Sequence, residues 1–156
     1  MSEQNGAPEP ITILMADDDE DDRELARDAL REARVANPLR FVVDGQDLID
    51  YLRREGDYAH PQADVPRPGI ILLDLNMPKK NGREALAEIK ADESLRRIPI
   101  VVLTTSKDEQ DVLTTYDLGA NSFITKPVTF AGLVEVMKEW GRYWFELVDL
   151  PNGQVE

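Results

Sequence analysis

The sequence predicts an α/β fold with a doubly wound, five-stranded parallel sheet flanked by five helices. Short apolar runs recur along the chain, and such runs are typical of parallel strands that are buried on both faces. Segments with helical spacing of apolar residues separate these runs, as crossovers between parallel strands require. With 156 residues, the chain is long enough for one globular domain with a sizeable core.

The first half of the chain supplies two strands, two helices and a long loop. The run ITILMA, residues 11–16, is the first strand. Apolar residues three or four positions apart over residues 23–34 predict a helix that runs from the acidic turn to the break at Asn37-Pro38. The run LRFVV, residues 39–43, is the second strand, and residues 47–54 form the second helix. Residues 56–69 hold three prolines, two glycines and the only histidine, so we expect a loop there.

The same two patterns alternate through the rest of the chain. Three further apolar runs predict strands at residues 70–75, 98–103 and 122–125. Helical spacing predicts helices over residues 82–89 and 108–118, and a last helix that begins near Thr129. The first ten residues, rich in Gly, Pro and Glu, are expected to be a disordered leader.

Polar residues directly follow four short runs that are mostly apolar, namely ITILMA, IILL, IPIVVL and SFIT. These polar residues are Asp17-Asp18, Asp74, Thr104 and Lys126-Pro127. In an open α/β sheet the functional groups gather beyond the carboxyl ends of the strands. We therefore expect three carboxylates, a hydroxyl and an ammonium to meet in one crevice.

The residue types in this crevice indicate phosphoryl chemistry. Crowded carboxylates repel one another unless a cation neutralises them, and oxygen ligands without Cys or His suit Mg²⁺. Lys126 and Thr104 would hold a transferring phosphoryl group from the side opposite the metal. Asp74 is ionised at neutral pH and needs no general base, so it is the expected nucleophile.

Each of these residues alone has a simpler interpretation. The acidic run at residues 17–22 could cap a helix in solvent, Asp74 could be a strand-end turn residue, and Lys126 could be a surface lysine. A calcium-binding helix-loop-helix is rejected, because the run follows a strand and lacks a glycine at the sixth loop position. Thr104 and Thr105 fit a strand equally well. Only their convergence at one edge of the sheet favours a site.

Four motifs together resemble the receiver domain of two-component response regulators, a flavodoxin-like fold, over about residues 10 to 140. They are the acidic pair, LLDLNMPKKNG, VVLTT and ITKP. The resemblance implies that Asp74 is phosphorylated and that Lys126 contacts the phosphoryl group. It implies Mg²⁺ bound directly by Asp18, Asp74 and the backbone carbonyl of Asn76, and through water by Asp17.

The resemblance also implies a cis bond before Pro127 and a conformational switch. In the family's scheme the Thr104 hydroxyl moves toward the phosphate and an aromatic residue on the fifth strand, here Phe123, follows it inward. Thr105 is assigned to the phosphoryl contact and switch with Phe123. Phenylalanine lacks the hydroxyl of the tyrosine found in many members, so coupling would rest on packing.

Charge and composition restrict the partners. A net charge of −13 argues against nucleic acid, and the lack of Cys and of a long apolar run favours a cytoplasmic protein without a membrane segment. We expect residues 11–140 to be the receiver domain and residues 141–156 to be a helix extension and tail. Because this aromatic-rich tail exceeds what a receiver core needs, we expect a homodimer through the fourth helix, the last helix and the tail.

The aromatic tail, the Pro-rich loop and the central motifs resemble stand-alone regulators paired with phytochrome-type sensor histidine kinases. The resemblance implies a phosphoacceptor that signals by protein contact rather than an enzyme. A haloacid-dehalogenase-type phosphatase would need an aspartate two residues after the nucleophile, where this chain has Asn76. The alternative is a phosphorylation-independent binding module, whose usual mark is loss of an acid or of the lysine.

Overall fold

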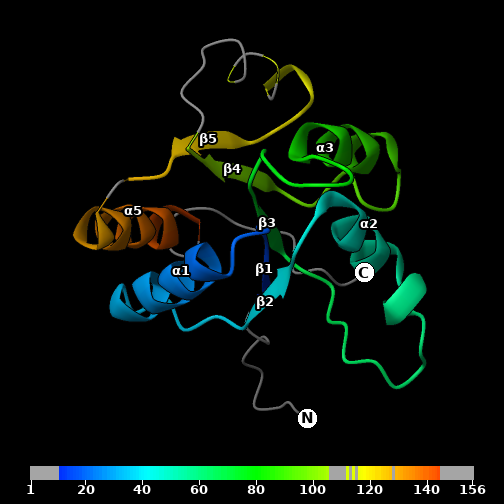
Figure 1. The fold of residues 1–156 in the computed structure, drawn as a ribbon, viewed down its shortest axis with the longest axis horizontal. Helices are drawn as coiled ribbons and strands as arrows, with labels where there is room; N and C mark the ends of the chain where they lie inside the picture. Colours follow the sequence, from blue (N-terminus) through cyan, green and yellow to red (C-terminus); the bar gives the residue numbers. More distant parts are fainter. Residues whose placement is uncertain (1–10, 106–111, 113, 115, 128, 145–156) are drawn as a thin grey trace.

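The structure, a computed structural model, describes residues 11–105, 112, 114, 116–127 and 129–144. Within this part of the chain, five parallel strands form one sheet in the order β2-β1-β3-β4-β5 (Figure 1). The strands are β1 Ile13–Ala16, β2 Leu39–Val42, β3 Ile70–Leu73, β4 Ile100–Thr104 and β5 Ser122–Thr125. The chain moves outward from β1 in both directions, so the sheet has its switch point between β1 and β3, where ligands bind in such folds.

Helices cover both faces of the sheet, which confirms the predicted fold class. They are α1 Glu20–Glu32, α2 Gly45–Arg53, the short 3₁₀ turn η1 Gly56–Tyr58, α3 Gly82–Ala91 and α5 Phe130–Arg142. In Figure 1, α1 and α5 lie together on one face, and α2 and α3 lie on the other. The predicted helix over residues 108–118 falls largely outside the described residues, but four of its described residues are helical, namely Val112, Thr114, Tyr116 and Asp117. The predicted leader also lies outside them.

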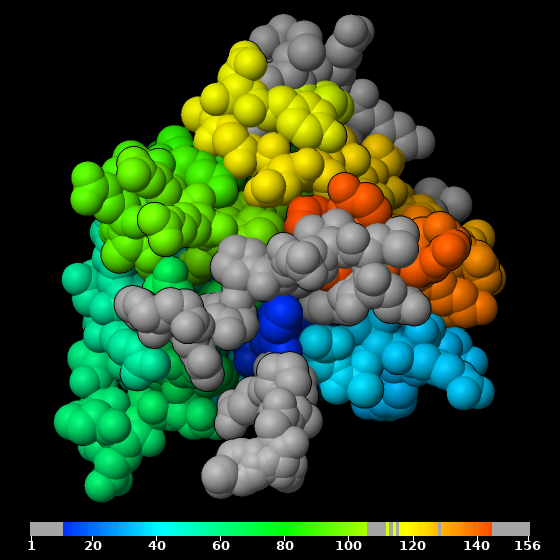
Figure 2. All heavy atoms as spheres, turned by 180° about the vertical axis from the view of Figure 1, so that it is seen from behind, coloured from blue at the N-terminus to red at the C-terminus, as the bar shows by residue number. Residues whose placement is uncertain are grey.

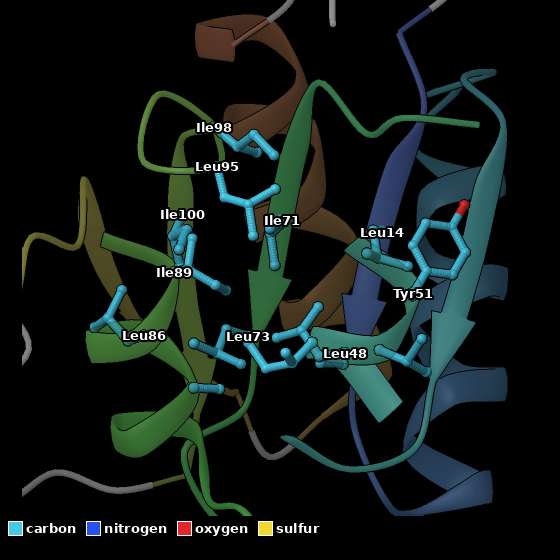
Figure 3. Close-up of a cluster of buried hydrophobic side chains, with 14 of the residues drawn as sticks. Leu14, Leu48, Tyr51, Ile71, Leu73, Leu86, Ile89, Leu95, Ile98 and Ile100 are labelled. Carbon is cyan, nitrogen blue, oxygen red and sulfur yellow. The ribbon is translucent and has the colours of Figure 1, made fainter. Parts of the chain in front are cut away.

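Each face of the sheet buries its own apolar cluster. Between the sheet and α2 and α3, side chains such as Leu48, Leu73 and Ile89 pack together with almost no exposed surface (Figure 3). On the other face, α1 and α5 pack on the sheet and on each other, and their atoms lie side by side in Figure 2. The two clusters hold the strands rigidly, so the residues that follow the strands have fixed positions.

The register of β1 and β3 determines where the residues that follow these strands lie along the edge of the sheet. Ala16 at the end of β1 is aligned with Leu73 at the end of β3, so Asp17 and Asp74 leave the sheet at the same level. The Asp74 backbone N–H donates a 3.0 Å hydrogen bond to the Ala16 carbonyl. The sheet therefore brings two predicted site residues together before any side-chain contact is considered.

Helix α1 begins at Glu20 within the acidic run, as the sequence predicts, and ends at Glu32, before the predicted break at Asn37-Pro38. Asp19 caps it by accepting hydrogen bonds from the backbone N–H groups of Asp21 and Asp22, at 2.8 and 3.3 Å. An aspartate is among the best N-cap residues, and the acidic first turn faces the positive end of the helix dipole. The cap extends the helix into the acidic run, which apolar spacing alone does not reveal.

Helix α3 begins directly against the loop that carries Asp74. A Cβ atom added at Gly82 would lie 2.4 Å from the Asp74 carbonyl oxygen and 2.6 Å from the Leu75 Cα. The Gly82 N–H donates a 3.0 Å hydrogen bond to the Leu75 carbonyl. Only glycine permits this close approach, so Gly82 fixes the position of the Asp74 loop. No helix among the described residues is long and apolar enough to cross a membrane.

Candidate functional site at the carboxyl ends of the strands

Asp17 is a fully buried carboxylate at the end of β1. Its Oδ1 accepts a 3.0 Å hydrogen bond from the Asp19 backbone N–H, and its Oδ2 accepts a 2.6 Å bond from the Lys126 ammonium. The Arg23 guanidinium donates a 2.8 Å bond to the Asp17 backbone carbonyl. These contacts fix the carboxylate in an environment where an unpaired charge would be costly.

Asp74 leaves the end of β3 beside Asp17 and is 8% exposed. Its Oδ1 accepts a 2.9 Å hydrogen bond from the hydroxyl of Thr104, which is fully buried at the end of β4, and a 3.2 Å bond from the Asn76 backbone N–H. Its Oδ2 contacts Lys126 as an ion pair at 3.6 Å. One carboxylate oxygen is therefore held by hydrogen bonds, and the other faces the ammonium.

Lys126 follows β5, and its side chain crosses the ends of the strands to the acids. Its backbone N–H donates a 2.8 Å bond to the Thr104 carbonyl, which anchors it next to β4. Its ammonium lies 2.6 Å from Asp17 Oδ2, 3.1 Å from Asp22 Oδ2 and 3.6 Å from Asp74 Oδ2, and the side chain is 12% exposed. Three carboxylates thus surround one largely buried ammonium.

For each of Asp17 and Lys126, burial and the oppositely charged neighbours shift the pKa in opposite directions. Burial raises the pKa of the Asp17 carboxyl above its usual value, and the hydrogen bond and charge of Lys126 only partly offset this. Burial alone would lower the pKa of Lys126, but its hydrogen bond to Asp17 and the charges of Asp74 and Asp17 outweigh burial and raise that pKa. The Lys126 ammonium therefore stays charged, whereas ionisation of the buried Asp17 carboxyl reduces the stability of the folded state.

Asp17, Asp18 and Asp74 each offer one carboxylate oxygen, and these oxygens lie within 4.8 Å of one another. Asp17 and Asp74 are buried and Asp18 is exposed, so the cluster opens to solvent on one side. Oxygen ligands at this spacing fit a hard divalent cation such as Mg²⁺ or Mn²⁺, which also retains several waters. The residues present therefore fit the metal that the sequence motifs imply.

The structure brings most of the predicted site residues together, but the side chains of three of them make no contact in the pocket. Thr105 is exposed just beyond β4. Phe123 is half-buried in β5 and packs against the apolar cluster under α2 and α3. The side chain of Asn76 is exposed, and its backbone supplies the contact with Asp74.

The expected cis bond between Lys126 and Pro127 is wrong for this structure, since no peptide bond among the described residues is cis. The trans form is intrinsically favoured by about 0.5–1 kcal/mol for a bond before proline. Lys126 already reaches Asp17 from the trans backbone. The cis form is therefore not needed to place the ammonium.

Sequence reasoning missed Asp22 and Arg23, which both contact the pocket from the first turn of α1. The signal that would have found them is the N-cap at Asp19, because a helix that begins at Glu20 makes Asp22 its third residue. Side chains in a helix lean toward its N-terminus, which here means toward the end of β1. Part of the acidic run is thus a component of the pocket.

Replacing Asp17 by Asn should change how stability depends on pH in the absence of metal. Because the folded chain raises the pKa of Asp17, this group stabilises the fold below its unfolded pKa of about 3.9, and that contribution is lost as pH rises through the raised folded pKa. Asparagine does not titrate. The stability of Asp17→Asn relative to wild type should therefore increase as pH rises above the unfolded pKa of about 3.9 and through the raised folded pKa of Asp17.

Urea denaturation at several pH values in chelator would measure this difference. Asp21→Asn, an exposed change in the first turn of α1, controls for loss of one acidic charge at this end of the molecule. A difference between Asp17→Asn and wild type that stays constant with pH would contradict the expected role of burial.

Comparisons with known proteins identify the family of this chain. The family model described as the response regulator receiver domain matches residues 13–138. Response regulator Rcp1 of Synechocystis sp. is 39% identical over 151 residues, which cover 97% of this chain and 99% of Rcp1.

Two solved structures have the same fold. The phosphorylated cyanobacterial phytochrome response regulator RcpA gives a TM-score of 0.83 at 42% identity, over 92% of this chain and 99% of that one. The Mn²⁺-bound form of response regulator Rcp1 gives a TM-score of 0.82 at 40% identity, over 91% of this chain and 99% of that one. With its acids, threonine and lysine at the ends of the strands, the chain belongs to the response regulator receiver domain family.

Proposed function

We propose that this chain is a response regulator that accepts a phosphoryl group on Asp74 in a Mg²⁺-dependent reaction and signals by protein contact. The observation that carries the proposal is the arrangement around Asp74: a largely buried carboxylate lies between the Thr104 hydroxyl and the Lys126 ammonium. Two further carboxylates lie within metal-binding range. A phosphoacceptor needs these groups, whereas an enzyme with turnover would also need a substrate pocket and a general acid.

In the proposed reaction a carboxylate oxygen of Asp74 attacks phosphorus. Oδ2 is the better candidate, because Oδ1 accepts two hydrogen bonds while Oδ2 contacts Lys126 only as an ion pair. A new O–P bond forms as the bond between phosphorus and the donor breaks, and the donor keeps that electron pair. The Lys126 ammonium and the Thr104 hydroxyl stabilise the charge on the phosphoryl oxygens.

Asp17, Asp18, Asp74 and the Asn76 carbonyl are the groups proposed to hold Mg²⁺. When bound, Mg²⁺ neutralises the carboxylates and the phosphoryl oxygens, so that an anionic donor can approach. Asp17 is held by Asp19 and Lys126, which keeps its carboxylate oriented toward the cluster. Removal of any of the three acids should weaken cation binding.

We propose a phytochrome-type sensor histidine kinase in the cytoplasm as the phosphodonor. The support is the similarity to a phosphorylated phytochrome response regulator across nearly the whole chain. The test is phosphotransfer from an autophosphorylated phytochrome-type kinase to wild type and to Asp74→Asn. Rapid loss of label from the kinase with wild type alone is the expected result, and equal loss with both proteins would contradict the assignment.

The signal is proposed to leave through β4 and β5. After transfer, the Thr104 hydroxyl would turn from Asp74 Oδ1 to a phosphoryl oxygen, and Phe123 would follow into the space that it leaves. Thr105, exposed beside Thr104, would move with the same segment. Phe123 packs on the α2 and α3 cluster without a hydrogen-bonding group, so this step would depend on packing.

We also propose a homodimer in which α5 takes part. A groove of about 590 Å³ runs between β5 and α5, and its lining includes Ile124, Val136, Trp140 and Tyr143. Tyr143 is 53% exposed and packs edge-on against Trp144. Trp144, also expected to serve the contact, lines the same groove although it is 8% exposed and packs in the core under α5. Residues 145–156 lie outside the described part of the chain.

Tyr143→Asp should therefore weaken self-association. A half-exposed aromatic residue beside an apolar groove is a typical interface anchor, and its replacement by a charge should raise the dimer dissociation constant about tenfold or more. Sedimentation velocity over a range of concentrations would measure this constant. Leu25→Asp on α1, where Leu25 is 43% exposed, is the matched control. Equal effects of the two variants would argue against a dimer through this groove.

A further inference from the structure

Lys126 has a carboxylate partner outside the proposed metal site. Its ammonium lies 3.1 Å from Asp22 Oδ2. Among the described residues, the acids whose oxygens cluster within 4.8 Å are Asp17, Asp18 and Asp74, and Asp22 is not one of them. The Asp22 side chain is 37% exposed and lies at the rim of the pocket. The Lys126 ammonium therefore contacts two of the proposed metal ligands, Asp17 and Asp74, and also Asp22, which is not one of them.

The closest contacts of Lys126 are with oxygens that a divalent cation would need. The ammonium donates a 2.6 Å hydrogen bond to Asp17 Oδ2 and lies 3.6 Å from Asp74 Oδ2. A divalent cation that draws on these two carboxylates competes with the ammonium for the same negative charge. Metal binding and the observed position of Lys126 thus oppose each other.

Asp22 is placed to relieve this competition. It is the third residue of α1, and its backbone N–H donates to the Asp19 cap, so its position is fixed by the start of the helix. Its carboxylate can keep the ammonium within reach of Asp74 after Asp17 has turned to the cation. Without Asp22, the remaining acceptors of the ammonium among the described residues would be Asp17 and Asp74, which the cation also requires.

We propose that Asp22 is a positioning residue that retains the Lys126 ammonium at the rim of the pocket when a divalent cation occupies Asp17, Asp18 and Asp74. This inference rests on the proposed function, because it requires the cation site. It adds a role for a residue of the acidic run that does not contact the cation. Asp22 acts through Lys126, so its effect should exist only while Lys126 is present.

A double-mutant cycle on Mg²⁺ binding tests this dependence. Isothermal titration calorimetry would give the Mg²⁺ dissociation constant of wild type, Asp22→Asn, Lys126→Met and the double variant. Asp21→Asn, in the same helical turn and with the same charge change, is measured in both backgrounds as the control. Asp22→Asn should raise the dissociation constant about two- to fivefold more than Asp21→Asn does, and this excess should disappear with Lys126→Met.

The inference would be overturned if Asp22→Asn and Asp21→Asn raised the Mg²⁺ dissociation constant equally, or if the excess effect of Asp22→Asn persisted with Lys126→Met. Either result would mean that Asp22 acts only through its negative charge, which attracts Mg²⁺ to the pocket. Circular dichroism checks that each variant folds, and Asp22→Ser serves as a second variant with the same expected result. Wild type that binds no Mg²⁺ would overturn the proposed function and this inference with it. Normal binding by wild type without Asp22–Lys126 coupling would overturn this inference alone.

Discussion

Replacing Lys126 by Met should slow phosphorylation of the chain by about 100-fold or more at saturating Mg²⁺. The ammonium is the only cationic group within ion-pairing distance of Asp74 among the described residues, at 3.6 Å. Loss of one preorganised group that stabilises charge in a transition state typically costs two to three orders of magnitude. The rate of phosphoryl incorporation from acetyl phosphate, followed by intact mass, measures this effect.

The same change should tighten Mg²⁺ binding, because Lys126 no longer competes for Asp17. A slower reaction together with tighter metal binding would distinguish loss of the ammonium from damage to the whole pocket. Lys79→Met removes a positive charge from the neighbouring loop, where Lys79 is 73% exposed and pairs with Asp44. This control should change neither quantity by more than about twofold. A Lys126→Met variant that is phosphorylated at the wild-type rate would contradict the role of the ammonium.

Gly82→Ala should destabilise the fold by about 3 kcal/mol. The new methyl group would meet the Asp74 carbonyl oxygen at 2.4 Å and the Leu75 Cα at 2.6 Å, and both are backbone atoms held between β3 and α3. Relief of this clash requires movement of the helix or of the Asp74 loop. Urea denaturation would measure the loss, and phosphorylation of the folded fraction would show whether Asp74 has moved.

Gly132→Ala provides the comparison. There the added Cβ would lie 2.9 Å from the Thr129 hydroxyl oxygen, which caps α5, and 3.0 Å from the Pro127 Cβ, and both are side-chain atoms. The expected loss is about 1 kcal/mol, smaller than at Gly82, because the Thr129 side chain can move at the cost of its cap hydrogen bond and alanine favours the helix. Equal stability losses at the two positions would contradict the argument that Gly82 fixes the Asp74 loop.

Much of the site is predictable because it depends on strand ends. The runs before Asp17, Asp74 and Thr104 are short and strongly apolar, and the run before Lys126 is short and ends at a proline motif, so each strand has a clear end. In a parallel sheet these ends share one edge, and the order of elements determines which strands are neighbours. Topology alone therefore brings residues together that are up to 109 positions apart in the chain, such as Asp17 and Lys126.

The remaining features depend on contacts that a periodic pattern does not encode. Asp19 caps α1 through side-chain hydrogen bonds, and the resulting start of the helix at Glu20 places Asp22 beside Lys126. Trp144 is expected at an interface, and it both lines the groove beside α5 and completes the core that α1 and α5 share. Large aromatic residues suit both environments, and only the packing of the helices distinguishes them.

Asp74 is proposed as the phosphoacceptor of a metal-dependent site. The direct test is the intact mass of wild type and Asp74→Asn after incubation with acetyl phosphate, each with Mg²⁺ and with chelator. Asp44→Asn changes another buried carboxylate that follows a strand, and it should still be phosphorylated. Wild type should gain one phosphoryl group in the presence of Mg²⁺. Asp74→Asn should gain none under either condition, and wild type should gain none in chelator. Equal modification of Asp74→Asn, or modification of wild type undiminished by chelator, would contradict this proposal.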